Sequence, residues 1–367
     1  MTSYYLYTGG YTEPAQMASG EVVPGRCCGI GCYALDGETG ALTRLAVTPS
    51  TPNPSHLTLS PDGRFLYCVN ELKEYEGVPG STASAYAVEE NGALQLLSRQ
   101  FTCGADACFA ALTPDGAQLL LANYSGGSVC ALPVLPDGGL GHAACVLRHS
   151  GHGADPARQQ GPHPHQILFA PDGRHVYVSD LGLDRLVCYR MDGETGWMVR
   201  DGWPDICGVP GQGIRHGVFA ASKRHLYVMT EMACELNVYG YDPVTGAASL
   251  LQRLSALEDG CRTPGLGAAI RLHPNGRLLY CSVRGSDQIV VFRVLDDGRL
   301  EPLRHEPCGG KIPRDFLLTP DGRFLLVGNQ DSDTVCVFAA DGESGALTPV
   351  WTQETVGAVT VLALAER

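Results

Sequence analysis

Basic residues are scarce in this sequence of 367 residues: 26 Lys and Arg stand against 39 Asp and Glu, and the formal net charge is −13. A chain this acidic offers no basic face to neutralise a nucleic-acid backbone or an anionic lipid surface. We therefore expect neither nucleic acid nor membrane as a partner. Charged residues make up only 18% of the chain and apolar residues 44%, which indicates a folded protein with a large core.

Long apolar runs are also missing. No uninterrupted stretch approaches the ~18 apolar residues that suggest a membrane-spanning helix. The first residues, Met-Thr-Ser-Tyr-Tyr-Leu-Tyr-Thr-Gly-Gly, lack the basic region and the apolar stretch of a signal peptide. The sequence therefore predicts a soluble cytoplasmic protein.

Familiar metal and nucleophile motifs are missing as well. The 15 cysteines include no Cys-x-x-Cys pair, so a zinc ribbon or thioredoxin-like site has no support, and their odd number favours reduced thiols. No Gly-x-Ser-x-Gly elbow occurs, although a serine triad can be built without one. The four histidines between residues 149 and 165 could bind a metal ion, but their spacing matches no common site. We expect no metal and no other cofactor.

What the sequence does contain is a repeat. An apolar strand, a turn resembling Pro-Asp-Gly and a second strand recur along the chain, and a degenerate copy has Ala221 in place of proline. The prolines of the other copies are Pro61, Pro114, Pro171, Pro274 and Pro320. A separate acidic turn with glycine occurs seven times, and the 305 residues from Gly40 to Gly345 give six intervals of about 51 residues. This period fits a four-stranded blade and not a helical repeat.

The ends of the chain indicate how the repeats close. Residues 4–10 look like the second strand of a blade that lacks its first strand, while residues 356–364 form a strand without a partner. We therefore predict an all-β fold: a seven-bladed β-propeller of four-stranded antiparallel blades, closed by pairing of the N- and C-terminal strands, with residues 1–367 as one domain. Two β-sandwiches are the alternative, but unrelated sandwiches would not share a turn at an even period.

The repeat also predicts where polar residues gather. If the strand before each turn is the innermost, its start and the end of the following strand lie at one mouth of the central channel. The residues six before each turn proline, or before Ala221, are Ser55, Cys108, His165, Arg215, Ala268 and Arg314. The pairs nine and ten after it are Asn70-Glu71, Asn123-Tyr124, Asp180-Leu181, Thr230-Glu231, Val283-Arg284 and Asn329-Gln330, with Gly10-Tyr11 by analogy.

This set combines an imidazole, carboxylates and arginines around one axis. A single polar strand end is explained by contact with solvent, but the convergence of Glu71 and Glu231 as possible bases with several arginines is not. Arginine binds phosphate or carboxylate through two parallel hydrogen bonds. Positive charge at the mouth of an acidic protein therefore favours a small anionic ligand.

Several stretches carry a family resemblance. They are residues 149–166, Gly213-Ile-Arg-His216 with Thr230-Glu231, Cys281-Ser-Val-Arg284, and Ile312-Pro-Arg-Asp-Phe316 with Gly328-Asn-Gln330. Over essentially its whole length the sequence resembles the seven-bladed propeller lactonases, a family that includes bacterial 6-phosphogluconolactonases and fungal carboxymuconate lactonizing enzymes. It departs from the family pattern in having Ile214 before Arg215 and Thr230 before Glu231.

The resemblance implies a site and a reaction. The catalytic positions of the family fall on His165, Arg215, Glu231 and Arg284. The further residues that we expect to contact substrate are Glu71, Asn123, Asp180, His216, Arg314 and Gln330. The implied reaction is hydrolysis of 6-phospho-D-glucono-1,5-lactone to 6-phosphogluconate in the pentose phosphate pathway.

In the corresponding mechanism Glu231 or His165 activates water and Arg215 stabilises the oxyanion. Arg284 and Arg314 hold the phosphate. The partner is then a small anionic sugar lactone. The alternatives are a related lactonase or muconate-type cycloisomerase acting on another anionic lactone, and a noncatalytic ligand-binding propeller. The segments 13–26, 73–84 and 150–164 exceed ordinary connections and are expected to rim one face of the propeller.

Overall fold

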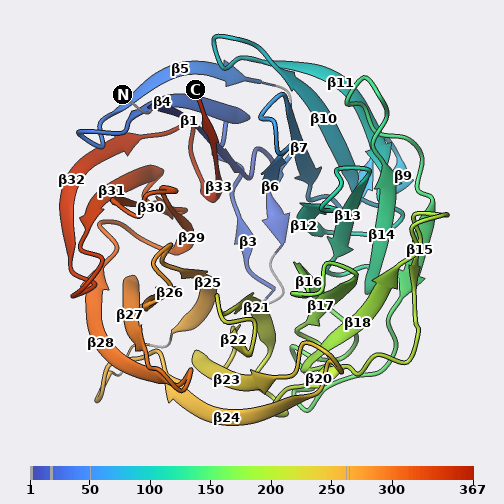
Figure 1. The fold of residues 1–367 in the computed structure, drawn as a ribbon. Coiled ribbons are helices and arrows are strands. Elements are labelled where there is room, and N and C mark those ends of the chain that lie inside the picture. The colour runs from blue at the N-terminus through green and yellow to red at the C-terminus, as the bar shows by residue number, and fades with distance from the viewer. Residues whose placement is uncertain (1–2, 17–19, 50, 262, 264) are drawn as a thin grey trace.

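The computed structural model describes residues 3–16, 20–49, 51–261, 263 and 265–367. Seven antiparallel sheets stand side by side in a ring around a central channel, as Figure 1 shows in a view down the ring axis. The predicted fold class is confirmed. Within the described ranges, no helix is long and apolar enough to cross a membrane.

The blades are numbered here in chain order, with their strands given from the channel outward. Blades 1 to 3 consist of β33 (Val359–Glu366), β1 (Ser3–Gly10), β4 (Ile30–Asp36) and β5 (Leu42–Thr48); β6 (Pro54–Leu59), β7 (Phe65–Asn70), β10 (Thr82–Val88) and β11 (Leu94–Phe101); and β12 (Ala107–Leu112), β13 (Gln118–Asn123), β14 (Ser128–Pro133) and β15 (Cys145–Arg148).

The remaining four blades continue the same order. Blades 4 to 7 consist of β16 (Pro164–Phe169), β17 (His175–Asp180), β18 (Arg185–Met191) and β19 (Met198–Val199), with β20 (Ile206–Cys207) also paired to β18; β21 (Ile214–Phe219), β22 (His225–Thr230), β23 (Glu235–Tyr241) and β24 (Ala248–Ser255); β25 (Leu266–Leu272), β26 (Leu278–Arg284), β27 (Gln288–Val294) and β28 (Leu300–Pro307); and β29 (Pro313–Leu318), β30 (Phe324–Asn329), β31 (Thr334–Ala340) and β32 (Leu347–Glu354). Two small hairpins lie between blade strands: β2 (Ala15–Gln16) with β3 (Val22–Val23), and β8 (Glu74–Tyr75) with β9 (Val78–Pro79).

Blade 1 closes the ring as the sequence predicts. The C-terminal strand β33 is its innermost strand and pairs antiparallel with β1, with Leu6 opposite Leu364. Apolar side chains fill the space between neighbouring blades: one cluster joins Leu6 of blade 1 to Leu326 of blade 7. Because both ends of the chain lie in one sheet, the ring has no open edge between its first and last blades.

The turns after the inner strands explain the recurring glycines. Five of these turns place glycine at φ between 69° and 74°, a conformation that glycine adopts without steric cost. The glycines are Gly63, Gly116, Gly173, Gly276 and Gly322. In the degenerate copy of blade 5, Lys223 takes the same conformation at φ 61°. The turn therefore forms there with lysine in place of glycine.

Every inner strand carries a β-bulge near the channel mouth. In six blades the pairing with the second strand skips one residue of the inner strand; in blade 4, for example, Pro164 pairs with Asp180 and Gln166 with Ser179, which leaves His165 unpaired. A bulge of this kind shifts the register by one residue and changes the direction in which a side chain points, while pairing continues on both sides. The skipped residues are Thr360, Ser55, Cys108, His165, Arg215 and Arg314, and in blade 6 the Ala268–Ala269 pair lies at the bulge.

Candidate functional site

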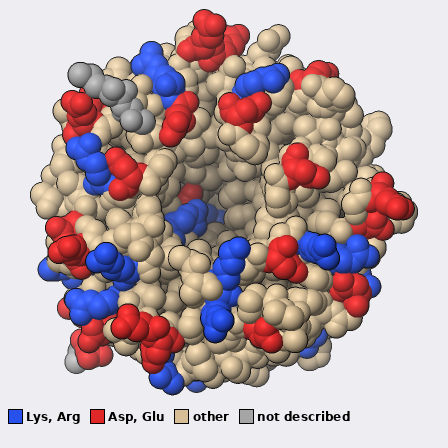
Figure 2. All heavy atoms as spheres, viewed as in Figure 1, with Lys and Arg blue, Asp and Glu red and all other residues tan. Residues whose placement is uncertain are grey.

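A pocket of about 450 Å³ opens at one mouth of the channel. Figure 2 shows the ring hollowed at its centre, with basic and acidic side chains inside the hollow. The walls come from the blades, and the hairpin β2–β3 crosses the mouth, where Figure 1 shows β3 over the centre of the ring. The pocket therefore lies where the repeat count predicts polar residues to converge.

Two positions of the repeat recur among the residues that line the pocket. One is the bulge residue of the inner strand, and the other is the residue ten positions after the turn proline or Ala221, at the end of the second strand or directly after it. The predicted site residues that line the pocket are Glu71, His165, Glu231, Arg284, Arg314 and Gln330. Arg215 and His216 lie deeper, against a second cavity below the pocket floor.

Asn123 and Asp180, which the sequence analysis predicts as substrate contacts, do not reach the pocket. Both are fully buried. The Asn123 amide donates to Thr102 O at 3.1 Å, and Asp180 Oδ1 accepts a hydrogen bond from His163 N at 2.8 Å. These two residues, nine positions after the turn proline, therefore hold the chain that enters the inner strand.

Glu231 is surrounded by three arginines. Its Oε1 accepts a hydrogen bond from Arg158 Nη2 at 2.6 Å, and its Oε2 accepts from Arg284 Nη2 at 2.8 Å and from Arg215 Nε at 3.2 Å. Burial alone would raise the pKa of Glu231, but Arg284 and Arg215 hold it well below its ordinary value. The carboxylate is thus charged, and its lone pairs are committed to guanidinium groups.

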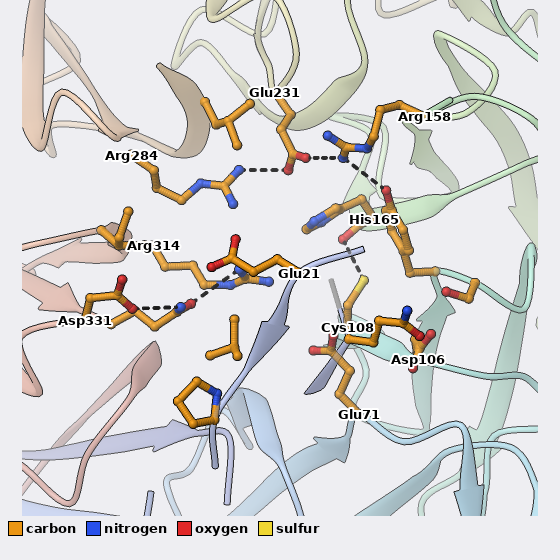
Figure 3. A pocket seen from close by; sticks show the side chains of 18 of the residues that line it. Glu21, Glu71, Asp106, Cys108, Arg158, His165, Glu231, Arg284, Arg314 and Asp331 are labelled. Atoms are coloured by element: carbon orange, nitrogen blue, oxygen red, sulfur yellow. Dashed lines mark hydrogen bonds and ion pairs between the residues drawn. The ribbon is translucent and has the colours of Figure 1, made fainter. Parts of the chain in front are cut away.

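Arg158 is the site residue that the repeat count misses. It belongs to the segment before β16, where Arg158 N bonds to Asp155 Oδ1 at 2.9 Å. The next residue, Gln159, is buried and donates from its amide to Asp184 Oδ2 at 2.7 Å. These contacts fold the segment 150–164 over one side of the mouth, as expected for a rim, and bring Arg158 to Glu231 (Figure 3).

Figure 3 shows Glu71 across the pocket from Glu231, and Glu71 is linked to Arg314 through Tyr11. Tyr11 OH lies 3.1 Å and 3.2 Å from the two carboxylate oxygens of Glu71. Arg314 Nη2 donates to the same hydroxyl at 3.1 Å. Burial raises the pKa of Glu71, and the charge of Arg314 opposes that shift only in part.

Arg314 differs from the other arginines of the pocket. Its Nη1 donates to Gln330 Oε1 at 3.4 Å, and its guanidinium lies 5.7 Å from the centre of the Tyr11 ring. In the part of the chain that the structure describes, Arg314 forms no ion pair. Its partners are neutral groups, so this cation can still bind an anionic ligand.

His165 lies between the two sides. It is buried, and its ring lies edge-on to Tyr124 and to His216, with centroids 5.7 Å and 5.1 Å apart. Burial and the charge of Arg215 hold the pKa of His165 well below its ordinary value. The imidazole is therefore neutral at pH 7 and can accept a proton.

A small cavity of about 20 Å³ lies directly beneath the pocket floor. Glu71, Cys108, His165 and Arg314 line both spaces, which makes the floor one side chain thick. His216 contributes to the cavity and contacts Arg215, whose Nη1 is 3.3 Å from His216 Nδ1. We therefore place His216 below the ligand pocket and not in it.

The four histidines of the segment 149–165 have separate surroundings. His149 Nδ1 pairs with Asp180 Oδ2 at 2.6 Å, and His163 stacks on Tyr124 with ring centroids 4.5 Å apart. Across the described ranges, no group of three or more His, Cys, Asp or Glu side chains is placed to hold a metal ion. Of this segment, Arg158 and His165 line the pocket, while His149 and His163 make contacts with neighbouring side chains.

The hairpin β2–β3 is anchored at two points around the mouth. Lys73 Nζ donates to Gln16 Oε1 at 3.0 Å, and Arg26 Nη2 lies 3.2 Å from Asp333 Oδ1. Figure 3 shows the Glu21 side chain over the pocket. The described residues of this segment, 13–16 and 20–26, thus contribute to the rim of the pocket.

Comparison with known proteins agrees with this architecture. A family model described as "Lactonase, 7-bladed beta-propeller" matches residues 5–363. The chain belongs to this lactonase family.

Relatives within the family carry related names. The chain is 31% identical to the 6-phosphogluconolactonase of Bacillus subtilis over 350 residues, which cover 95% of this chain and 94% of that protein. It is 28% identical to the 6-phosphogluconolactonase of Formosa agariphila, over 87% of this chain and 90% of that one. The solved structure of the periplasmic gluconolactonase of Pseudomonas aeruginosa matches with a TM-score of 0.88 and 32% identity, and the match covers 99% of each chain.

Proposed function

We propose that this lactonase-family propeller hydrolyses 6-phospho-D-glucono-1,5-lactone to 6-phosphogluconate. The observation that supports an anionic substrate is Arg314, which projects from a bulge into the pocket and is held by the neutral Tyr11 and Gln330. An arginine in this state binds a phosphate through paired hydrogen bonds without first breaking an ion pair. The Bacillus subtilis and Formosa agariphila relatives bear the name of this activity.

In the proposed reaction His165 removes a proton from water as the water oxygen attacks C1 of the lactone. A neutral imidazole with a lowered pKa is present as a base throughout the neutral range. Glu231 is less suited to this step because three guanidinium groups occupy its oxygens. A positioned base accounts for a rate increase of about 10²–10⁴.

The negative charge that develops on the carbonyl oxygen needs a cation. Arg215 is buried below the floor beside His165 and is held in place by Glu231, so it is placed to stabilise this oxyanion. Arg284 is fixed by Glu231 and by the carbonyl of Gly267, each at 2.8 Å, and supports Arg314 in binding the phosphate. Glu231 in this scheme orients cations and does not titrate.

A nonphosphorylated sugar lactone is the second candidate, and one observation favours it. The carboxylates of Glu21 and Asp331 line the same pocket as Arg284 and Arg314, so the mouth is not purely cationic. The Pseudomonas aeruginosa relative is named a gluconolactonase. Carboxylates can accept hydrogen bonds from sugar hydroxyls, and they repel a phosphate at short range.

Hydrolysis of both freshly prepared lactones, corrected for the spontaneous reaction, tests the proposal. We expect the wild type to prefer the phosphorylated lactone. Arg314→Gln should raise KM for that lactone about 100-fold because a charge-assisted bidentate contact is lost, with little change for gluconolactone. Arg293→Gln, which removes an exposed arginine paired with Glu301, is the matched control. Equal loss on both lactones would contradict phosphate binding by Arg314.

A further inference from the structure

We propose that Glu71 gives the proton to the ring oxygen as the lactone opens, and that the cavity below the pocket returns this proton from His165. This inference rests on the proposed lactone hydrolysis. It assigns a role to a carboxyl group that neither water activation nor anion binding requires. It also separates the two glutamates of the site into one that titrates and one that holds cations.

Lactone opening requires a proton donor. The water oxygen forms a bond to C1 and its proton moves to His165; the bond between C1 and the ring oxygen then breaks, and both electrons stay on the ring oxygen. An alkoxide is a poor leaving group at neutral pH, so a carboxylic acid that protonates it lowers the barrier. The products are a hydroxyl group and a carboxylic acid, which releases its proton to solvent.

Glu71 has the placement of such a donor. It lines the pocket on the side opposite Glu231, close to His165 and separated from it along the wall by Cys108 (Figure 3). Its carboxyl oxygens contact a phenol hydroxyl, that of Tyr11, and within the described ranges they form no ion pair. A carboxyl group held by a neutral partner can carry a proton, whereas Glu231 cannot do so without releasing its arginines.

The small cavity gives the proton a path from His165 back to Glu71. After one turnover His165 is protonated and Glu71 is ionised, and both residues line the cavity of about 20 Å³. That space accommodates one water molecule. His165 Nδ1 is buried and has no hydrogen-bond partner among the described residues. A water at this place would connect the imidazole to the carboxylate, and a proton moving along it restores both groups.

Charges around Glu71 set the pH range of this role. Burial raises the pKa of Glu71 and Asp106 acts in the same direction, while Arg314, Ser55 and Tyr11 lower it. Cys108 also faces the carboxyl from the neighbouring blade, and its own thiol pKa is raised well above its ordinary value by burial. The acid form of Glu71 therefore persists above the pH at which an exposed glutamic acid ionises, and activity should fall as pH rises through its pKa.

Glu71→Gln is the test, with kcat and KM measured across pH on the phosphorylated lactone. We expect kcat to fall about 100-fold, KM to change less than about threefold, and the alkaline decline of kcat to disappear. Affinity for the product 6-phosphogluconate, measured by calorimetry, should stay within about threefold and shows that the site is intact. Glu74→Gln, an exposed glutamate three residues further along the chain, is the matched control and should behave as the wild type.

Tyr11→Phe gives a second readout. Tyr11 lowers the pKa of Glu71 through its hydrogen bond, so removal of the hydroxyl should move the alkaline decline to higher pH, which a merely structural loss would not do. An unchanged kcat in Glu71→Gln, or a change in KM alone, would overturn the inference while wild-type activity sustains the proposed function. A wild type inactive on both lactones would overturn both.

Discussion

Glu71 and Glu231 occupy the same position of two repeats, yet their surroundings are opposite. Each follows the second strand of its blade, ten residues after the turn. Glu231 is bound by three guanidinium groups, and its pKa is lowered well below the ordinary value. Glu71 is bound by Tyr11, and its pKa is raised. When two carboxyl groups of one site are shifted apart in this way, they take different roles in acid–base chemistry.

The bulge residues account for one part of the difference. The bulge beside Glu231 in blade 5 carries Arg215, whereas the bulge beside Glu71 in blade 2 carries Ser55. The backbone is the same in both blades, so one side chain in each inner strand changes the charge around the neighbouring carboxylate. The repeat provides the position of each carboxylate, and Arg215 at the bulge adds to the charge that Arg284 and Arg158 bring to Glu231.

The largest effect that we expect from this comparison is on stability. Glu231→Gln leaves buried guanidinium groups without their carboxylate, which typically costs about 3–5 kcal/mol when a buried ion pair loses one partner. Glu71→Gln removes no ion pair and should change the free energy of unfolding by less than about 1 kcal/mol. Urea unfolding of both variants at pH 7 makes the comparison. Equal losses would mean that the two glutamates are equivalent.

The pH dependence of stability should have opposite signs for the two residues. Because the pKa of Glu231 is lower in the folded state, its stabilisation is present above pH 4.5 and is lost as pH falls through the folded pKa. Because the pKa of Glu71 is higher in the folded state, folding loses stability as pH rises from 4.5 through that pKa.

Free energies of unfolding measured from pH 3 to pH 8 test these signs. The free energy of unfolding of Glu231→Gln should approach that of the wild type as the pH falls below the pKa that Glu231 has in the unfolded wild type. Glu71→Gln should gain stability relative to the wild type as pH rises, and the gain should level off above the folded pKa of Glu71. If the free energies of unfolding of the wild type and Glu71→Gln changed with pH in the same way, the pKa of Glu71 would be the same in the folded and unfolded states.

A smaller effect than that of Glu231→Gln is expected at Arg158. Its side chain is 19% exposed, and Glu231 keeps Arg215 and Arg284 when Arg158 is removed. Arg158→Gln should therefore lower the free energy of unfolding by about 1.5–3 kcal/mol, the usual range for a hydrogen bond to a charged group. In the Glu231→Gln background the same substitution should cost little, and a double-mutant cycle measures this coupling. If the two substitutions lowered the free energy of unfolding additively, Arg158 would not be coupled to Glu231.

The fold and part of the pocket lining were predictable because they follow the repeat. The bulge and the strand end lie at fixed distances from the turn, so a count from Pro61 or Ala221 reaches Ser55, Glu71 and Glu231 without a structure. The same count could not separate positions nine and ten, because consecutive residues at the end of a strand point in different directions. Asn123 and Asp180 were therefore assigned to the ligand when they hold the backbone.

Residues outside the repeat could not be placed by counting. Arg158 reaches Glu231 only because Gln159 is buried against Asp184 and Asp155 orders the turn before it. The contacts of Arg158 with Glu231 and of Gln159 with Asp184 join segments that are distant in sequence. The periodicity of the sequence does not predict such contacts. Length alone predicts that the segments 13–26, 73–84 and 150–164 rim one face of the propeller, but it does not say which side chains they bring to the pocket.

The placement of β33 has a consequence for synthesis of the protein. Residues 359–366 form the innermost strand of blade 1, and Thr360 lines the cavity beneath the pocket. The first blade therefore stays incomplete, with β1 lacking its inner neighbour, until β33, which follows the other described strands in the sequence, has left the ribosome. Blades 2 to 7 can form in order as they emerge, but neither the ring nor the channel wall is complete before that moment. A nascent chain cannot bind its ligand in a finished site, and the exposed edge of β1 is the part most in need of protection during translation.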